Sequence, residues 1–136
     1  YRYGIDEIRP GGWHEVAARR EVVSPGPGPE ALSPEARAWL AGLKAECDRR
    51  GVKLAYAIPW FYGSEEDRPV MVEAHRRFLD DVGRIVPVMP DPSMGVNTRR
   101  ADYADSTVHP TGEAARRRTD DLARLLRDWR PEVAPR

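Results

Sequence analysis

The sequence predicts an α/β fold in which a partial parallel sheet is flanked by helices. Segments 33–50, 69–82 and 111–129 carry helical apolar periodicity, and two short apolar runs at 52–58 and 85–89 lie between them. Short links in this order favour parallel strands joined by crossover helices. Because two or three strands leave open edges and a half-covered core, we expect the sheet to be incomplete within this chain.

Residues 1–32 are rich in proline and glycine and predict an extended surface connection. The run Ser24–Pro29 excludes a helix there, because each proline lacks an N–H donor and restricts the residue before it. One short strand is expected near Val22–Val23. The α/β unit is then expected to span residues 33–130, followed by a tail at residues 131–136.

The first helix has clear start and stop signals. Ser33 can cap it, and Pro34 suits its first position. Gly51 follows two arginines in the last turn, which is typical of a helix end. The apolar stripe expected to face inward is Ala36, Trp39, Leu40, Leu43 and Cys47.

The two predicted strands flank the second helix. Val52–Ile58 is a near-continuous apolar run, which suits a strand covered on both faces, and Pro59–Ser64 is the loop that leaves it. A helix is expected over Pro69–Val82. Ile85–Met89 is a short second strand, in which Pro87 favours an edge position. The inward side chains expected from this helix are Val70, Ala74, Phe78 and Val82.

A long loop from Pro90 to Pro110 precedes the last helix, which is expected from about Thr111 to Trp129. In open α/β sheets, ligands bind at the carboxyl ends of the strands, so this loop and Pro59–Arg68 are where a site is expected. The inward residues expected from the last helix are Ala115, Leu122, Leu125, Leu126 and Trp129.

Composition excludes several function classes. Basic and acidic residues balance at 22 each, so nucleic acid is not expected as a partner. The sequence contains no apolar run of about 18 residues, so no membrane span is predicted. The single cysteine, Cys47, leaves no internal disulfide. Because His14, His75 and His109 are scattered and no glycine-rich phosphate loop occurs, neither a metal nor another cofactor is expected.

Asp105 and His109 lie in the long loop just before the last helix. Imidazole titrates near neutral pH, and a carboxylate can fix its tautomer and stabilise its charged form, as a general base requires. Pro110 biases His109 towards extended backbone, so the pair is expected to meet across a turn. On spacing alone the pattern is weak, and His109 can equally cap the helix or bond to backbone.

Other residues of the two loops have structural interpretations. Asp102 is expected to pair with Arg99 or Arg100 at the surface. Ser64 lacks a Gly-x-Ser-x-Gly elbow and is expected to cap the second helix, on whose exposed face His75 is expected. Three consecutive aromatic side chains can either form a wall for a sugar or acyl chain or pack beneath the adjoining loop. They are Trp60, Phe61 and Tyr62.

The stretch Tyr103–Gly112, followed by Arg118–Thr119 and a leucine-rich helix, resembles the closing block of an SGNH/GDSL-type hydrolase. It is most similar to the branch of bacterial acyl-esterase and polysaccharide O-acetyltransferase-like proteins. Upstream, Cys47–Gly51 ends a helix that is followed by a strand and a loop at Pro59, also as in that branch. The likeness covers residues 34–128 and implies the three-layer SGNH-hydrolase-like fold.

The resemblance implies that His109 is the general base and Asp105 its orienting partner. This sequence departs from the family in two ways. The commonest family spacing is Asp-x-x-His, and Ser106 stands at that nearer position. The Gly-Asp-Ser nucleophile block and the oxyanion-hole Gly and Asn are not found in this chain, so the pair lacks a hydroxyl to activate and donors for a tetrahedral intermediate.

Two functions are therefore expected to compete. The first is the carboxyl-terminal part of an SGNH-like ester hydrolase or O-acyltransferase, acting on a small-molecule or carbohydrate ester. Its serine would come from a missing amino-terminal segment or a separate chain, so the isolated chain is expected to be inactive. The second is a non-catalytic SGNH-like domain that binds a carbohydrate or a protein partner. The Asp105/His109 pair favours the first, and the absent nucleophile favours the second.

Overall fold

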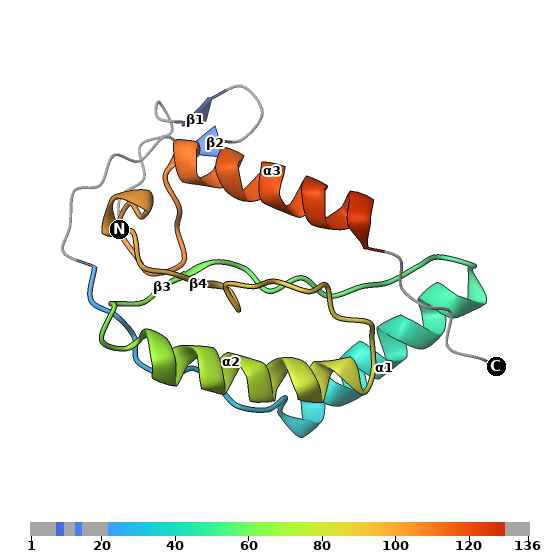
Figure 1. Ribbon diagram of the computed structural model, residues 1–136. Helices are drawn as coiled ribbons and strands as arrows, with labels where there is room; N and C mark the ends of the chain where they lie inside the picture. The colour runs from blue at the N-terminus through green and yellow to red at the C-terminus, as the bar shows by residue number, and fades with distance from the viewer. Residues whose placement is uncertain (1–7, 10–12, 15–21, 130–136) are drawn as a thin grey trace.

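The computed structural model describes residues 8–9, 13–14 and 22–129. Within these residues the chain forms three α-helices, four two-residue strands and a short 3-10 helix (Figure 1). The helices are α1 (Pro34–Arg49), α2 (Arg68–Gly83), α3 (Gly112–Asp128) and the 3-10 helix η2 (Arg100–Asp102). The strands are β1 (Ile8–Arg9), β2 (Trp13–His14), β3 (Phe61–Tyr62) and β4 (Val96–Asn97).

The fold is α/β, with a small parallel sheet flanked by helices, as the sequence predicts. α1 and α2 lie on one side of the strand layer, and α3 lies on the other (Figure 1). β1 and β2 form a separate antiparallel pair inside the predicted connection 1–32. The strand predicted near Val22–Val23 is wrong, because both residues lie in irregular backbone, where Val22 is buried and Val23 is exposed.

The parallel ladder lies further along the chain than the sequence predicts. β3 pairs with β4, with Phe61 opposite Val96, although Phe61 was expected in a loop. The predicted strands do run side by side, but they meet at one parallel bridge, Tyr56 to Val88. There the Tyr56 amide donates to the carbonyl of Pro87 at 2.9 Å. Pro59 follows the first segment and Pro87 lies within the second, and neither can donate a ladder hydrogen bond, which limits the pairing.

Helix α1 starts and stops as predicted but is poorly covered. Ser33 Oγ accepts the amide of Ala36 at 3.1 Å, and Gly51 takes a φ of +69° after the last turn. Described over its whole length, α1 buries none of its residues. Its expected inward stripe is wrong at Ala36, which is exposed, and at Trp39, which is 69% exposed. An ion pair from Arg37 to Asp81 of α2 attaches the helix to the rest of the molecule.

Helix α2 supplies most of the buried helical surface. Ala74 and Val82 are buried as predicted and Phe78 is partly buried, but the prediction is wrong at Val70, which is 56% exposed, while its neighbour Met71 is buried. His75 was expected at the surface, and this is wrong: it is 6% exposed, and its Nδ1 lies 2.7 Å from the carbonyl oxygen of Met94. Apolar periodicity missed it because a histidine whose ring nitrogen finds a backbone partner can be buried at low cost. Its ring packs on Phe61.

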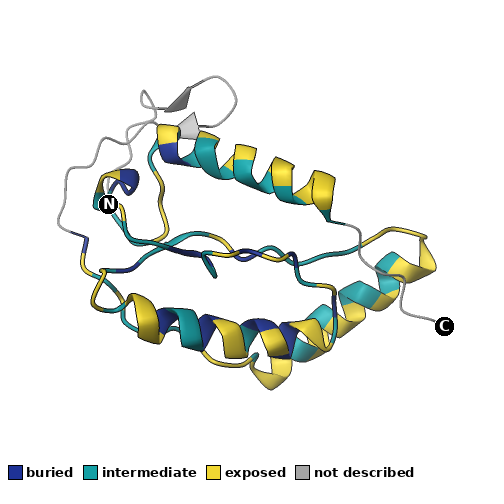
Figure 2. Ribbon diagram, in the orientation of Figure 1, coloured by how far each residue is buried: buried dark blue, intermediate teal, exposed yellow. Residues whose placement is uncertain are grey.

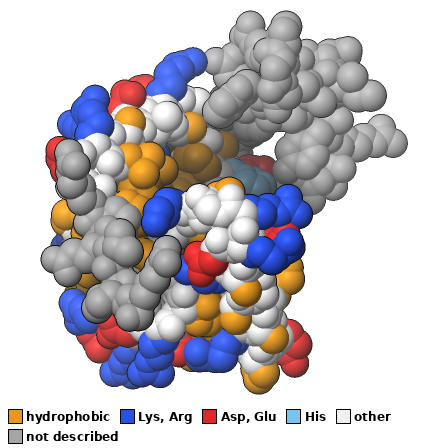
Figure 3. All heavy atoms as spheres, turned by 90° about the vertical axis from the view of Figure 1, so that its right-hand side faces the viewer, with side chains coloured by type: hydrophobic (Ala, Val, Ile, Leu, Met, Phe, Trp, Pro, Cys, Tyr) orange, Lys and Arg blue, Asp and Glu red, His pale blue; other side chains and the backbone are white. Residues whose placement is uncertain are grey.

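Helix α3 begins as predicted at the cap Thr111, whose Oγ1 accepts the amide of Ala114 at 3.3 Å. Ala114 is buried, whereas Leu126 is mostly exposed, contrary to its expected inward position. Figure 2 shows the same asymmetry, with burial concentrated on α2 and the strand layer. Hydrophobic side chains also gather in a hollow on the face shown in Figure 3, with charged side chains along part of its edge. No helix among the described residues has the length and apolar character to cross a bilayer.

Candidate functional site

The structure brings Asp105 and His109 together across a turn. His109 Nδ1 lies 2.9 Å from Asp105 Oδ1. The turn is closed at its base by an antiparallel bridge between Tyr103 and Pro110 and by the amide of Ala104, which donates to the carbonyl of His109 at 3.0 Å. The backbone path, and not a helical spacing, therefore sets the distance between the carboxylate and the imidazole.

The two side chains differ in exposure. The Asp105 side chain is 12% exposed, whereas that of His109 is 58% exposed. With Nδ1 held by the carboxylate, Nε2 is the ring nitrogen left to exchange a proton with another molecule. The mostly buried carboxylate of Asp105 can thus hold the imidazole of His109 so that its other nitrogen faces solvent as a base.

Asp102 supports this turn from the interior: it forms the expected ion pair with Arg99, but it is buried and not at the surface. It is buried, accepts from Asn97 Nδ2 at 2.8 Å and pairs with the guanidinium of Arg117, while Arg99 is more distant at 3.8 Å. Burial raises the pKa of its carboxyl, but the bonds from Asn97 and Arg117 outweigh burial and hold that pKa below its usual value. Asp102 is therefore a buried anion at neutral pH.

Tyr103 adds a second buried anchor next to Asp102. Its side chain is fully enclosed, and its ring lies 5.6 Å from that of Tyr62 on β3. Burial, followed by the nearby Asp102 charge, strongly raises the pKa of its phenol. The turn is thus attached both to the sheet and to α3.

The two serines considered from the sequence are engaged in turns. Ser64 Oγ accepts the amide of Asp67 at 3.0 Å and donates to the carboxylate of that residue at 2.8 Å. Ser106 Oγ accepts the amide of Val108 at 3.4 Å. Both hydroxyls therefore stabilise local backbone, Ser64 in the turn that leads into α2.

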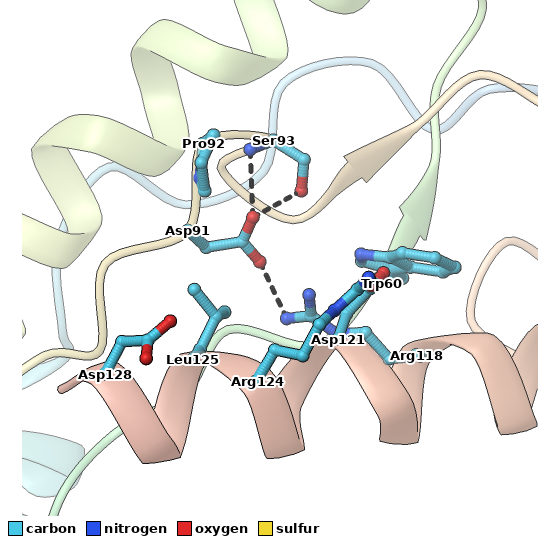
Figure 4. Close-up of a pocket in the computed structure, with 9 residues that line it drawn as sticks. All are labelled: Trp60, Asp91, Pro92, Ser93, Arg118, Asp121, Arg124, Leu125 and Asp128. Carbon is cyan, nitrogen blue, oxygen red and sulfur yellow. Dashed lines mark hydrogen bonds and ion pairs between the residues drawn. The ribbon is translucent and has the colours of Figure 1, made fainter.

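A second concave region, which sequence reasoning missed, lies between α3 and the strand layer (Figure 4). This pocket of about 290 Å³ is lined by Trp60, by the loop that contains Asp91, and by one face of α3 from Arg118 to Asp128. Asp105 and His109 are not among its lining residues. The sequence drew attention to Trp60, through its run of aromatic residues, and to Arg118, through the family resemblance. It gave no indication of Asp91, which reaches the pocket only because the chain turns before β4.

Among the described residues, no cluster of three or more His, Cys, Asp or Glu side chains could hold a metal ion, and the side chain of His14 lies outside them. Comparisons of the chain with known protein families, with curated protein sequences and with solved structures each gave no match.

Proposed function

We propose that the chain is the carboxyl-terminal part of an SGNH-like ester hydrolase or O-acyltransferase, to which it contributes the Asp105–His109 pair. The observation that carries the proposal is the 2.9 Å contact between His109 Nδ1 and Asp105 Oδ1, with the imidazole open to solvent. Helices on both sides of a parallel sheet are compatible with such a framework. The serine nucleophile and the oxyanion donors come from outside this chain.

The proposed chemistry is a general-base acyl transfer. The serine Oγ attacks the ester carbonyl carbon while its proton passes to His109 Nε2, and a bond forms between Oγ and that carbon. Asp105 stabilises the imidazolium and keeps Nδ1–H directed towards its own carboxylate. The proton then moves from Nε2 to the leaving alkoxide as the ester C–O bond breaks. Water or an acceptor alcohol repeats the sequence to release the acyl group.

The first prediction concerns hydrolysis of p-nitrophenyl acetate by the full-length gene product that contains this chain. His109→Ala is expected to lower kcat by about 10²-fold to 10⁴-fold, because the serine loses its base. Val108→Ala, at the exposed neighbouring position, is the matched control and is expected to keep its rate within about twofold. The isolated chain is expected to show no turnover above buffer.

Equal rates for wild type and His109→Ala, or no hydrolysis by the full-length product, would contradict the proposal and favour a non-catalytic domain. A second arm separates loss of catalysis from loss of geometry. Nitrogen-15 NMR of the neutral His109 ring is expected to show the proton on Nδ1, since the partner of one ring nitrogen selects the tautomer. Asp105→Asn is expected to mix the two tautomers, whereas Asp121→Asn on α3 leaves the ring unchanged.

A further inference from the structure

The outward face of α1 carries no charge along most of its length. The exposed residues between Glu35 and Glu46 are Ala36, Ala38, Trp39, Ala41, Gly42 and Ala45. The indole of Trp39 is 69% exposed, and Figure 2 shows α1 without a buried residue. The charged side chains of this stretch, Arg37 and Lys44, are paired with carboxylates. A surface helix normally presents charged and polar groups to water, so a bare indole among small side chains indicates a face that another molecule covers.

Glu35, Gly42 and Arg49 lie along the middle of this face. They are spaced seven residues apart, which is close to two helical turns, and all three are exposed. Glu35 is in the first turn of α1 and Arg49 in the last. A Cβ added at Gly42 would meet no atom within 4 Å among the described residues. The line therefore has an acid at one end, a base at the other and, at its centre, a position where a second backbone can approach closely.

This pattern is complementary to itself. When a second α1 lies antiparallel on the first with the two-fold axis at Gly42, Glu35 of each copy lies opposite Arg49 of the other, because both are seven residues from the centre. A parallel pair would place acid on acid and base on base, which repel. Arg49 is otherwise held only by an exposed ion pair to Glu46, which is easily exchanged. Charge therefore selects the antiparallel pair.

We propose that two copies of this chain associate through α1 in a weak, antiparallel, two-fold contact centred on Gly42. Trp39 and Ala45, each three residues from the centre, then lie at the same level, so that a large side chain of one copy meets a small one of the other. The 16 residues of α1 make a helix about 24 Å long. One face of it buries roughly 400 Å² from each copy, about half of what a stable complex buries, so the dissociation constant is expected on the order of 0.1 to 1 mM. This inference does not depend on the proposed catalysis.

The test is sedimentation equilibrium of the chain from about 10 µM to about 1 mM at low ionic strength, where surface charges are least screened. The average mass is expected to rise with concentration from 15.4 kDa towards twice that value. Gly42→Lys, at a position with open space, is expected to keep the circular dichroism of wild type and to stay monomeric. Trp39→Ala is expected to weaken association at least about fivefold. Leu126→Ala, at an exposed position on α3, is the matched control and should associate like wild type.

Charge variants test the orientation. Glu35→Arg and Arg49→Glu each place like charges at both ends of the pair, and each alone is expected to weaken association about tenfold. An equimolar mixture of the two restores an acid–base pair at both ends and is expected to associate like wild type. Glu113→Arg and Arg127→Glu, at the same spacing on α3, are the matched controls; each should associate like wild type, and their mixture should gain nothing. A monomer at every concentration, association unchanged by Gly42→Lys, or single charge variants that associate as well as their mixture would overturn the proposal.

Discussion

At the scale of single residues, Asp102 connects the candidate site to the interior. Its carboxylate accepts from Asn97 on β4 and pairs with Arg117 on α3, while its carbonyl oxygen accepts the amide of Thr111 at 2.7 Å. One residue thus joins the sheet, the start of α3 and the turn that carries His109. Loss of its charge would leave the donors of Asn97 and Arg117 without their acceptor, which is more costly than loss of an exposed ion pair.

The pKa of Asp102 makes this contribution dependent on pH. Because that pKa is lowered on folding, the stabilisation is present above the unfolded-state value of about 3.8 and is lost as pH falls through the lower folded-state value. Asp102→Asn is expected to lower the free energy of unfolding by about 2 kcal/mol at pH 7. The difference from wild type should shrink below about pH 4, as measured by urea denaturation. A difference that is constant from pH 7 to pH 3 would contradict the assignment.

At the scale of elements, the β3–β4 pairing depends on a close approach at Gly95. This residue has a φ of +73°, and its carbonyl accepts the amide of Phe61 at 2.7 Å. A Cβ placed there would lie 2.6 Å from the carbonyl oxygen of Pro59. Backbone strain and a backbone clash would therefore act together at the start of the ladder.

Gly95→Ala is expected to lower the free energy of unfolding by about 2 to 3 kcal/mol in urea denaturation, because the new methyl group meets backbone and the φ is unfavourable. Gly42→Ala is the matched control in α1, where a Cβ meets no atom within 4 Å among the described residues. The control is expected to raise stability by up to about 1 kcal/mol through helix propensity. Equal effects of the two substitutions would contradict the structural role of Gly95.

The helices could be predicted from sequence far better than the strand pairing. Capping and stop signals act within a few residues, so Ser33, Gly51 and Thr111 lie where local chemistry places them. The ladder at Phe61 depends on a turn at residues 91–95 that shifts two distant segments into register. The Asp105–His109 contact was predictable because its turn is local, whereas the Asp91–Arg118 pocket needs three separated segments.

At the scale of the whole molecule, burial is unevenly distributed. α2 buries six residues, whereas α1 buries none within its described length, and Trp39 remains largely exposed. The parallel sheet has two strands in the described part of the chain, which agrees with the expectation of a partial sheet. The strongest packing therefore lies where α2 meets the strand layer.

Amide hydrogen exchange at pH 7 should report this distribution. Amides in the middle of α2 are expected to show protection factors at least about tenfold higher than those in α1 and in the second half of α3, because few buried contacts oppose local opening there. Rates referenced to the unfolded chain and measured by NMR would test this. Equal protection in all three helices would show that α1 and α3 are held more firmly than their exposure indicates.

The connection of β3, α2 and β4 also implies an order of assembly. Their contacts lie within residues 61–97, so they require closure of a short chain segment and are expected to form early. The turn with Asp105 and His109 is hydrogen-bonded to the start of α3, and both come after residue 97 in the chain. A nascent polypeptide leaves the ribosome from its amino-terminal side. The framework is therefore in place before the carboxylate and imidazole can meet, and the half-made protein carries no preformed base.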